Sequence, residues 1–103
     1  MSDPVVITGL ARTPMGGLQG VFADVTAHAL GAAAIREAVA RAGAPNIDQT
    51  IMGCVLGAGQ GQAPARQASK GAGLGDDVPA TTINKMCGSG MQAAILAHDM
   101  LKA

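Results

Sequence analysis

The chain has 103 residues, of which 49% are apolar and 14% are charged, and its seven basic residues balance its seven acidic residues. This length suits one small domain and excludes a multidomain enzyme. The apolar content argues against disorder, the lack of a Lys/Arg run argues against a nucleic-acid partner, and the lack of an apolar stretch of ~20 residues argues against a membrane partner.

The first half of the chain predicts one strand and one helix. The continuous apolar run 5–7 (VVI) suits a strand buried on both faces. Repeated Gly and Pro residues predict that 11–24 is a loop. Over 25–42, apolar residues recur at spacings of three and four, which predicts an amphipathic helix. Asp24 is its expected N-cap, and Gly43 is its expected stop signal.

The second half predicts two further strands, each followed by a helix. The apolar segment 50–56 (TIMGCVL) is typical of a buried strand, and a Gly-rich stretch then leads into a short helix over 64–72. The β-branched residues of 80–86 (ATTINKM) indicate a third strand. From Gly88 onward the apolar residues cover almost the whole circumference of a helix, which predicts a helix buried between layers.

This order of strand, helix, strand, helix, strand, helix predicts an α/β domain with a largely parallel sheet. Phe22 is the single aromatic residue, so Ala, Gly and aliphatic side chains must fill the core, and closely packed thin layers are expected. Because no later residues cover the apolar last helix, we expect an incomplete domain that needs partner surface. An acidic residue near the N-terminus disfavours a secretion signal and leads us to expect a cytoplasmic protein.

The two cysteines, Cys54 and Cys87, are far apart in sequence and form neither a C-x-x-C pair nor a zinc-like cluster with His28 and His98. Neither a disulfide framework nor a metal site is therefore predicted. Cys54 lies inside an apolar strand, where a cysteine acts as a small hydrophobic residue.

Cys87 has a different setting, because a predicted strand turns into a helix there and Gly88-Ser89-Gly90 follows. The first N–H groups of a helix carry partial positive charge, so a thiolate at this place is stabilised and its pKa is expected to be lowered. The same N–H groups suit the oxyanion of a tetrahedral intermediate. This pattern leaves two interpretations open, an activated nucleophile and an inert buried thiol.

Three segments resemble thiolases, the acetyl-CoA acetyltransferase family. The segment 84–93 (NKMCGSGMQA) is similar to the family's active-site cysteine motif. The opening 5–20 (VVITGLARTPMGGLQG) resembles its first strand and loop, and 55–74 (VLGAGQGQAPARQASKGAGL) resembles its second strand and following helix. The resemblance covers essentially the whole chain.

The resemblance implies that Cys87 attacks acyl-CoA to form an acyl-enzyme thioester, with its backbone N–H in an oxyanion hole. A second, deprotonated acetyl-CoA would then attack the thioester in a Claisen condensation, and the reverse reaction is thiolysis of a 3-oxoacyl-CoA. The stretch 60–67 (QGQAPARQ) looks most like the short-chain biosynthetic members, which favours acetoacetyl-CoA formation.

The resemblance also implies a thiolase-like fold of which 1–103 is only the N-terminal portion, within the first βαβαβα half. The rest of the N-terminal domain, the loop domain and the C-terminal domain would be absent. Coenzyme A enters as a thioester substrate, so no cofactor is expected. The whole protein would act in fatty acid metabolism as a homo-oligomer, a dimer or tetramer.

In this family the histidine that activates the nucleophile and a second catalytic cysteine come from later parts of a longer chain. His98 does not replace that base, because eleven helical residues at ~1.5 Å each place it roughly 16 Å from Cys87 along the axis. His28 lies near the start of the first helix and is interpreted as a surface residue. The chain by itself is therefore expected to be inactive.

A dinucleotide-binding module is one alternative, because Gly88-x-Gly90-x-x-Ala93 follows a strand and opens a helix as the Rossmann pattern does. The acidic residue that the pattern needs ~20 positions later would lie past Ala103.

A second alternative is a packing or assembly module without chemistry, in which Cys87 is an ordinary thiol. Lys70, Asp76 and Asp77 are interpreted simply as solvated charges.

Overall fold

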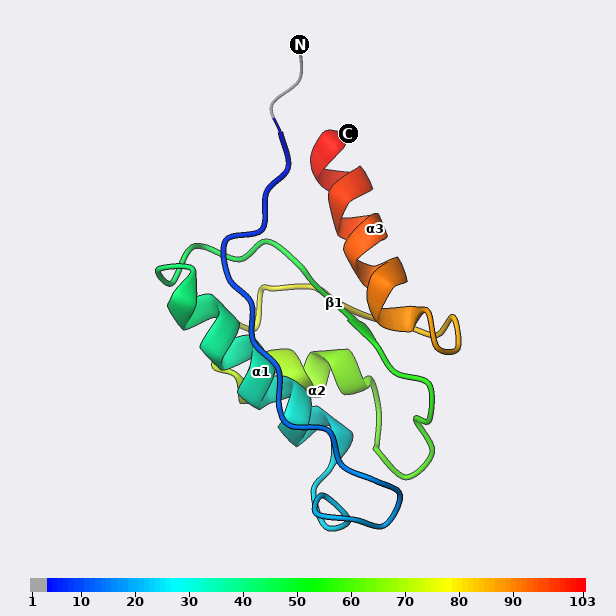
Figure 1. The fold of residues 1–103 in the computed structure, drawn as a ribbon. Helices are drawn as coiled ribbons and strands as arrows, with labels where there is room; N and C mark the ends of the chain where they lie inside the picture. Colours follow the sequence, from blue (N-terminus) through cyan, green and yellow to red (C-terminus); the bar gives the residue numbers. More distant parts are fainter. Residues whose placement is uncertain (1–3) are drawn as a thin grey trace.

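The computed structural model describes residues 4–103, which form a small α/β unit (Figure 1). Its elements in chain order are α1 (Ala27–Arg41), β1 (Thr50–Gly53), α2 (Pro64–Gly71), β2 (Ala80–Ile83) and α3 (Ser89–Lys102). The strands β1 and β2 pair in parallel, with Thr50 opposite Ala80 and Gly53 opposite Ile83. The predicted α/β class with a parallel sheet is confirmed. Asp3, the acidic residue behind the cytoplasmic prediction, lies outside the described residues.

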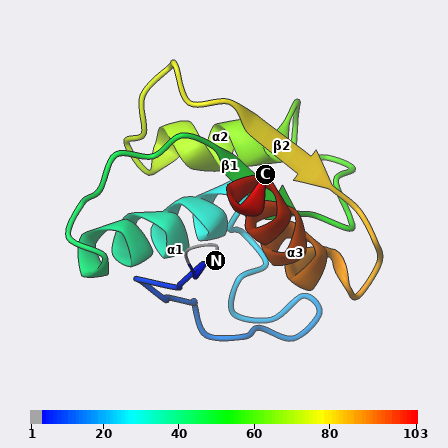
Figure 2. The ribbon, with the colours of Figure 1, turned by 90° about the horizontal axis from the view of Figure 1, so that it is seen from above.

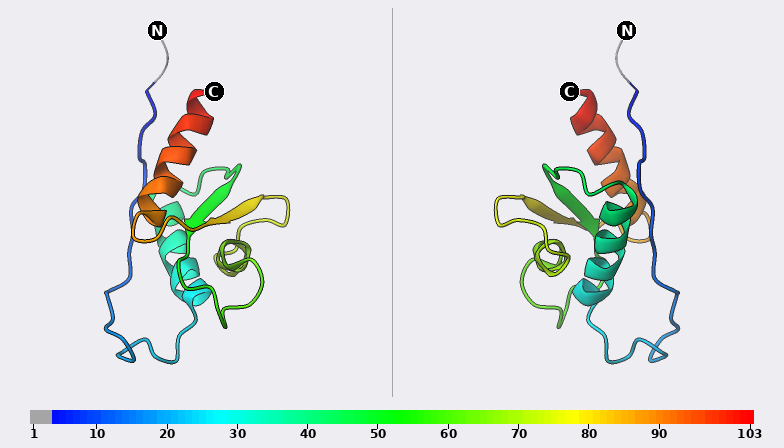
Figure 3. Two further views of the ribbon diagram at one scale, coloured as in Figure 1. Left: turned by 90° about the vertical axis from the view of Figure 1, so that its right-hand side faces the viewer. Right: turned by 90° about the vertical axis from the view of Figure 1, so that its left-hand side faces the viewer.

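The two strands lie between helices, with α3 on one side of the sheet and α2 on the other (Figures 2 and 3). Side chains of β1 alternate between these sides, as the pleat of a strand requires. Thr50 faces α2, where its Oγ1 lies 3.2 Å from the Ser69 Oγ. Gly53 faces the start of α3, because a Cβ built on it would lie 2.7 Å from the Cβ of Ser89. The helix α1 packs on α2.

Small side chains form the contacts between α1 and α2, as the composition predicted. A Cβ on Gly31 would lie 3.1 Å from the Ala68 Cβ, and a Cβ on Gly71 would lie 3.1 Å from the Ala32 Cβ. The fully buried Ser69 shares its hydroxyl with Thr50, so this core polar group is satisfied. Glycine and alanine therefore let the backbones of the two helices approach closely.

The start of α1 differs from the prediction, because Thr26 rather than Asp24 is the N-cap. Thr26 has an extended backbone, and its Oγ1 accepts a hydrogen bond of 3.2 Å from the Ala29 N–H. A cap must directly precede the first helical residue to reach the third helical N–H. Asp24 lies two residues too early, and the Gln60 Oε1 instead accepts the Ala27 N–H at 2.8 Å.

The predicted strand over 5–7 is wrong. This segment belongs to no sheet in the part of the chain that the structure describes, and Ile7 is 78% exposed. The N-terminal segment instead runs over α1 (Figure 1), where the Arg41 Nη1 donates a 2.7 Å hydrogen bond to the Leu10 carbonyl. An apolar run predicts an extended backbone, but a strand also needs a hydrogen-bonded neighbour.

The other two strands are shorter than the predicted ranges 50–56 and 80–86, because each ends after four residues. The Cys54 N–H still donates to the Ile83 carbonyl at 3.0 Å, and the two backbones then separate into loops.

The predicted burial of α3 on all sides is not found among the described residues. The helix packs on β1 and Ala93 is buried, but Met91 and Leu101 are each 70% exposed. No helix in residues 4–103 is both long and apolar enough to cross a membrane.

Candidate active site

Cys87 lies in the turn between β2 and α3, at the carboxyl end of the parallel strands. Its thiol is free and exposed. Cys54, the other free thiol, follows the carboxyl end of β1 and is half-buried. Parallel α/β sheets commonly bind ligands at this end, so the exposed cysteine stands where a substrate is expected.

Backbone hydrogen bonds close the turn that carries Cys87. The Gly88 N–H donates to the Lys85 carbonyl at 3.0 Å, and the Ser89 N–H donates to the Met86 carbonyl at 3.1 Å. Met86, the residue just before the cysteine, has a left-handed backbone with φ of 49°. A bulky residue with a positive φ is uncommon, and such strained conformations concentrate at functional sites.

Side chains add further hydrogen bonds to this turn. The Asn84 Oδ1 accepts the Met86 N–H at 2.9 Å. The Ser89 Oγ accepts the Lys85 N–H at 2.8 Å and donates to the Met86 carbonyl at 2.6 Å. Both ends of the strained residue are therefore held by side chains.

The start of α3 offers N–H groups beside Cys87. Gly88 is the N-cap, and no side chain among residues 4–103 caps the first turn. The Ser89 N–H is used inside the turn, but the later N–H groups of the first turn carry partial positive charge and can bind an anion or a developing oxyanion. This arrangement suits attack of a thiolate on a carbonyl carbon.

Gly53 allows α3 to begin where it does. A Cβ at residue 53 would lie 2.7 Å from the Ser89 carbonyl carbon and 2.9 Å from the Gly90 nitrogen, closer than real Cβ contacts come. The absence of a side chain at Gly53 therefore sets the approach of α3 to β1 and, through it, the place of the Cys87 turn.

Neither histidine is bonded near the Cys87 turn. The His28 Nδ1 lies 3.4 Å from the Thr26 Oγ1 at the start of α1, and His28 is half-buried rather than fully solvated. The His98 Nδ1 lies 3.0 Å from the Asp99 Oδ1 far along α3. The described residues thus bring Cys87 and the two histidines into no hydrogen-bonded group.

Lys70 and Asp76, interpreted above as solvated charges, form an ion pair, although both side chains are exposed. The hydrogen bond from Lys70, with its positive charge, holds the pKa of the Asp76 carboxyl below its ordinary value. This pair links the end of α2 to the loop that leads into β2. It lies away from the Cys87 turn in sequence, and we assign it no chemical role.

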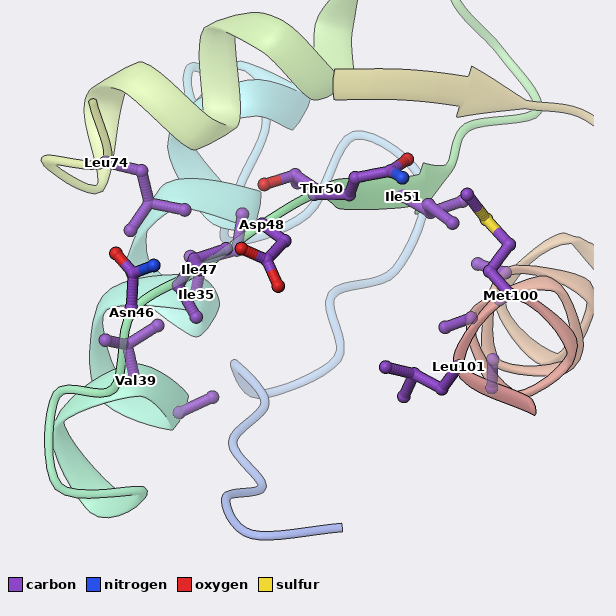
Figure 4. Close-up of a pocket in the computed structure, with 16 residues that line it drawn as sticks. Ile35, Val39, Asn46, Ile47, Asp48, Thr50, Ile51, Leu74, Met100 and Leu101 are labelled. Carbon is purple, nitrogen blue, oxygen red and sulfur yellow. The ribbon is translucent and has the colours of Figure 1, made fainter. Parts of the chain in front are cut away.

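A groove of about 770 Å³ lies between α1, β1 and α3, and its walls are mostly apolar (Figure 4). Leu101 of α3 and Val39 of α1 stand on opposite sides of it. Cys87 does not line this groove, whereas Gly90 in the first turn of α3 does. Among the described residues no group of three His, Cys, Asp or Glu side chains lies together as a metal site would need.

Ser89, Asn84 and Gly53 were missed as site residues from sequence. A glycine inside an apolar strand signals a close backbone approach, and this signal could have identified Gly53. No sequence pattern indicates that Ser89 turns its hydroxyl backward toward the preceding turn.

The chain is thus an α/β unit with parallel strands, and it carries an exposed cysteine between a strand and a helix. The profile described as "Thiolase, N-terminal domain" matches residues 5–103. The chain therefore belongs to the thiolase family.

Several relatives are similar over almost the whole chain. Acetyl-CoA acetyltransferase B, mitochondrial, of Xenopus laevis is 52% identical over 101 residues, which is 96% of this chain and 24% of the relative. A probable acetyl-CoA acetyltransferase of Mycobacterium tuberculosis is 50% identical over 105 residues, covering 100% of this chain and 26% of the relative. The acetyl-CoA acetyltransferase of Syntrophomonas wolfei is 49% identical with the same two coverages. The chain thus spans about a quarter of the length of these relatives.

Proposed function

We propose that this chain supplies the acyl-accepting cysteine of a thiolase that acts on acetyl-CoA, and that Cys87 is that cysteine. The observation that carries the proposal is the place of Cys87, an exposed free thiol on a strained turn at the uncapped start of α3. Relatives of about 50% identity that are named acetyl-CoA acetyltransferases support the choice of acetyl-CoA.

In the proposed reaction the Cys87 thiolate attacks the carbonyl carbon of acetyl-CoA. The carbonyl oxygen becomes negative, and the N–H groups at the start of α3 stabilise it. The bond to the coenzyme A sulfur then breaks, the leaving thiolate takes up the proton that the Cys87 thiol had lost, and the acetyl group stays on Cys87 as a thioester. A base then removes a proton from the methyl carbon of a second acetyl-CoA. The resulting carbanion attacks the thioester, forms the carbon–carbon bond of acetoacetyl-CoA and releases the Cys87 thiolate, to which the removed proton returns.

The second half of this reaction needs groups that residues 4–103 do not place beside Cys87. His28 and His98 are hydrogen-bonded locally elsewhere. General acid–base groups typically contribute about 10²–10⁴-fold each to rate. We therefore expect the 103-residue chain to accept one acetyl group slowly and not to turn over.

The test is to incubate the purified chain with acetyl-CoA, measure released coenzyme A, and locate the acetyl group by peptide mass spectrometry. We expect up to one equivalent of coenzyme A, acetyl on Cys87, and no acetoacetyl-CoA. Cys87→Ser should abolish the release, whereas the matched Cys54→Ser should not change it. Repeated turnover that depends on Cys87 would show that a base is present after all, and no acetylation would favour the packing module.

The cytoplasmic location and the homo-oligomeric state of the whole protein stay predictions.

A further inference from the structure

Met86 is held in a conformation that its own side chain does not explain. Its φ of 49° lies in the left-handed region, which is strained for a residue with a Cβ. Met86 is 67% exposed, so little packing is available to keep it there. The hydrogen bonds around the turn must therefore hold this backbone.

Ser89 provides two of those bonds from one buried hydroxyl. The residue is 4% exposed, and its Oγ bridges the Lys85 N–H at 2.8 Å and the Met86 carbonyl at 2.6 Å. These two groups lie on either side of Met86 along the backbone. A change of the Met86 dihedral angles would move them relative to each other and break at least one of the bonds.

Ser89 does not occupy the position at which a serine usually stabilises a helix. A serine that serves a helix normally occupies the N-cap and accepts from N–H groups of the first turn. Here Gly88 is the N-cap, and Ser89 is already the first helical residue. Its hydroxyl bonds backward to the turn, where it adds nothing to α3 itself. Alanine would be the better helix former at this position.

We propose that Ser89 is a positioning residue for Cys87, because its hydroxyl locks the left-handed turn at Met86 that presents the thiol at the start of α3. This inference rests on the proposed function, since Ser89 acts through the cysteine assigned there. Asn84 supports the same turn from the other side through its bond to the Met86 N–H.

The decisive comparison uses two buried serines of the same chain. Ser69→Ala removes a fully buried hydroxyl that is bonded to Thr50, away from the Cys87 turn. Ser89→Ala removes the hydroxyl that is bonded to Lys85 and Met86. Both changes are expected to lower stability, so stability alone does not separate a positioning role from an ordinary buried hydrogen bond.

The measurement is the rate at which iodoacetamide modifies Cys87, relative to Cys54 in the same molecules, determined by peptide mapping at pH 7. We expect Ser89→Ala to lower this ratio roughly tenfold, the order of size of one to two lost hydrogen bonds. Ser69→Ala should leave the ratio within about twofold of the unmodified chain, because it changes no group of the turn.

A rescue variant tests the mechanism and covers the case in which Ser89→Ala folds poorly. Glycine adopts a positive φ without strain. Met86→Gly in the Ser89→Ala background should therefore restore the ratio to within about threefold of the unmodified chain, since the turn no longer needs the serine. A merely structural serine would give no such recovery.

The outcomes separate this inference from the proposed function. If Cys87 reacts faster than Cys54 in the unmodified chain but Ser89→Ala keeps the ratio, or Met86→Gly fails to restore it, the role of Ser89 is refuted and the nucleophile stands. If Cys87 reacts no faster than Cys54 in the unmodified chain, the proposed nucleophile itself is refuted.

Discussion

Cys87 and Cys54 are two free thiols of one chain with different surroundings. Cys87 is exposed beside the first turn of α3, whereas Cys54 is half-buried and its N–H continues the pairing of the strands. We expect iodoacetamide to modify Cys87 first at pH 7, because only its thiol combines exposure with nearby helix N–H groups. Peptide mapping over time checks this order. Equal labelling, or Cys54 labelled first, would contradict it.

Asp76 provides a residue-scale prediction about pH. The hydrogen bond from Lys70, followed by its positive charge, lowers the pKa of the carboxyl. A carboxyl whose pKa is lower in the folded state stabilises that state above its unfolded pKa of about 3.9, and the contribution is lost as pH falls through the folded value. Because Asp76 is exposed, we expect this effect on stability to be small.

We expect Lys70 to be the main cause of the lowered pKa of Asp76. In Lys70→Met we expect the pKa of Asp76 to rise toward its ordinary value, measured by NMR titration of the side-chain carboxyl carbon. Lys85→Met is the matched control, because Lys85 bonds to Gln92 rather than to Asp76. An unchanged Asp76 pKa in Lys70→Met would show that the ion pair does not form in solution.

At the scale of elements, the contact between β1 and α3 depends on Gly53. An added methyl group would overlap the backbone of Ser89 and Gly90, which no side-chain rotation relieves. We expect Gly53→Ala to lower the free energy of unfolding by about 1–3 kcal/mol, measured in urea, and to slow modification of Cys87 as α3 shifts. Gly57→Ala is the control, because a Cβ there meets nothing within 4 Å. Equal stability of the two variants would contradict this account.

The helices and strands could be predicted from the sequence more accurately than the neighbours with which they pair. The periodicity over 25–42 identified α1 nearly to its ends, because an amphipathic face is a local property of the sequence. The run 5–7 was predicted as a strand, but pairing depends on residues distant in sequence and the described chain offers it no neighbour. The same difference between local and distant signals holds for the residues of the candidate site. Cys87 was predicted from its motif, whereas the hydroxyl bridge of Ser89 depends on the three-dimensional turn.

For the molecule as a whole, the unusual feature is the apolar surface around α3. Leu101, Met91 and Ile95 are exposed on that helix, and the apolar groove between α1, β1 and α3 lies beside it. Few acidic or basic residues interrupt this surface, since Asp99 and Lys102 are the only Asp, Glu, Lys or Arg residues of α3. Exposed apolar side chains beside an apolar groove favour association in water.

We therefore expect the 103-residue chain to self-associate as its concentration rises, which sedimentation velocity would show as a growing species larger than the monomer. Leu101→Lys should weaken this association by about tenfold or more, because it replaces apolar area that the contact would bury. Leu18→Lys is the matched control. Leu18 is 98% exposed on the loop before α1, outside the groove, so the same substitution should leave association unchanged. A strictly monomeric chain with one sharp, cooperative melting transition would show that α3 needs no further cover. Equal effects of Leu101→Lys and Leu18→Lys would show that the surface through which the chains associate lies elsewhere.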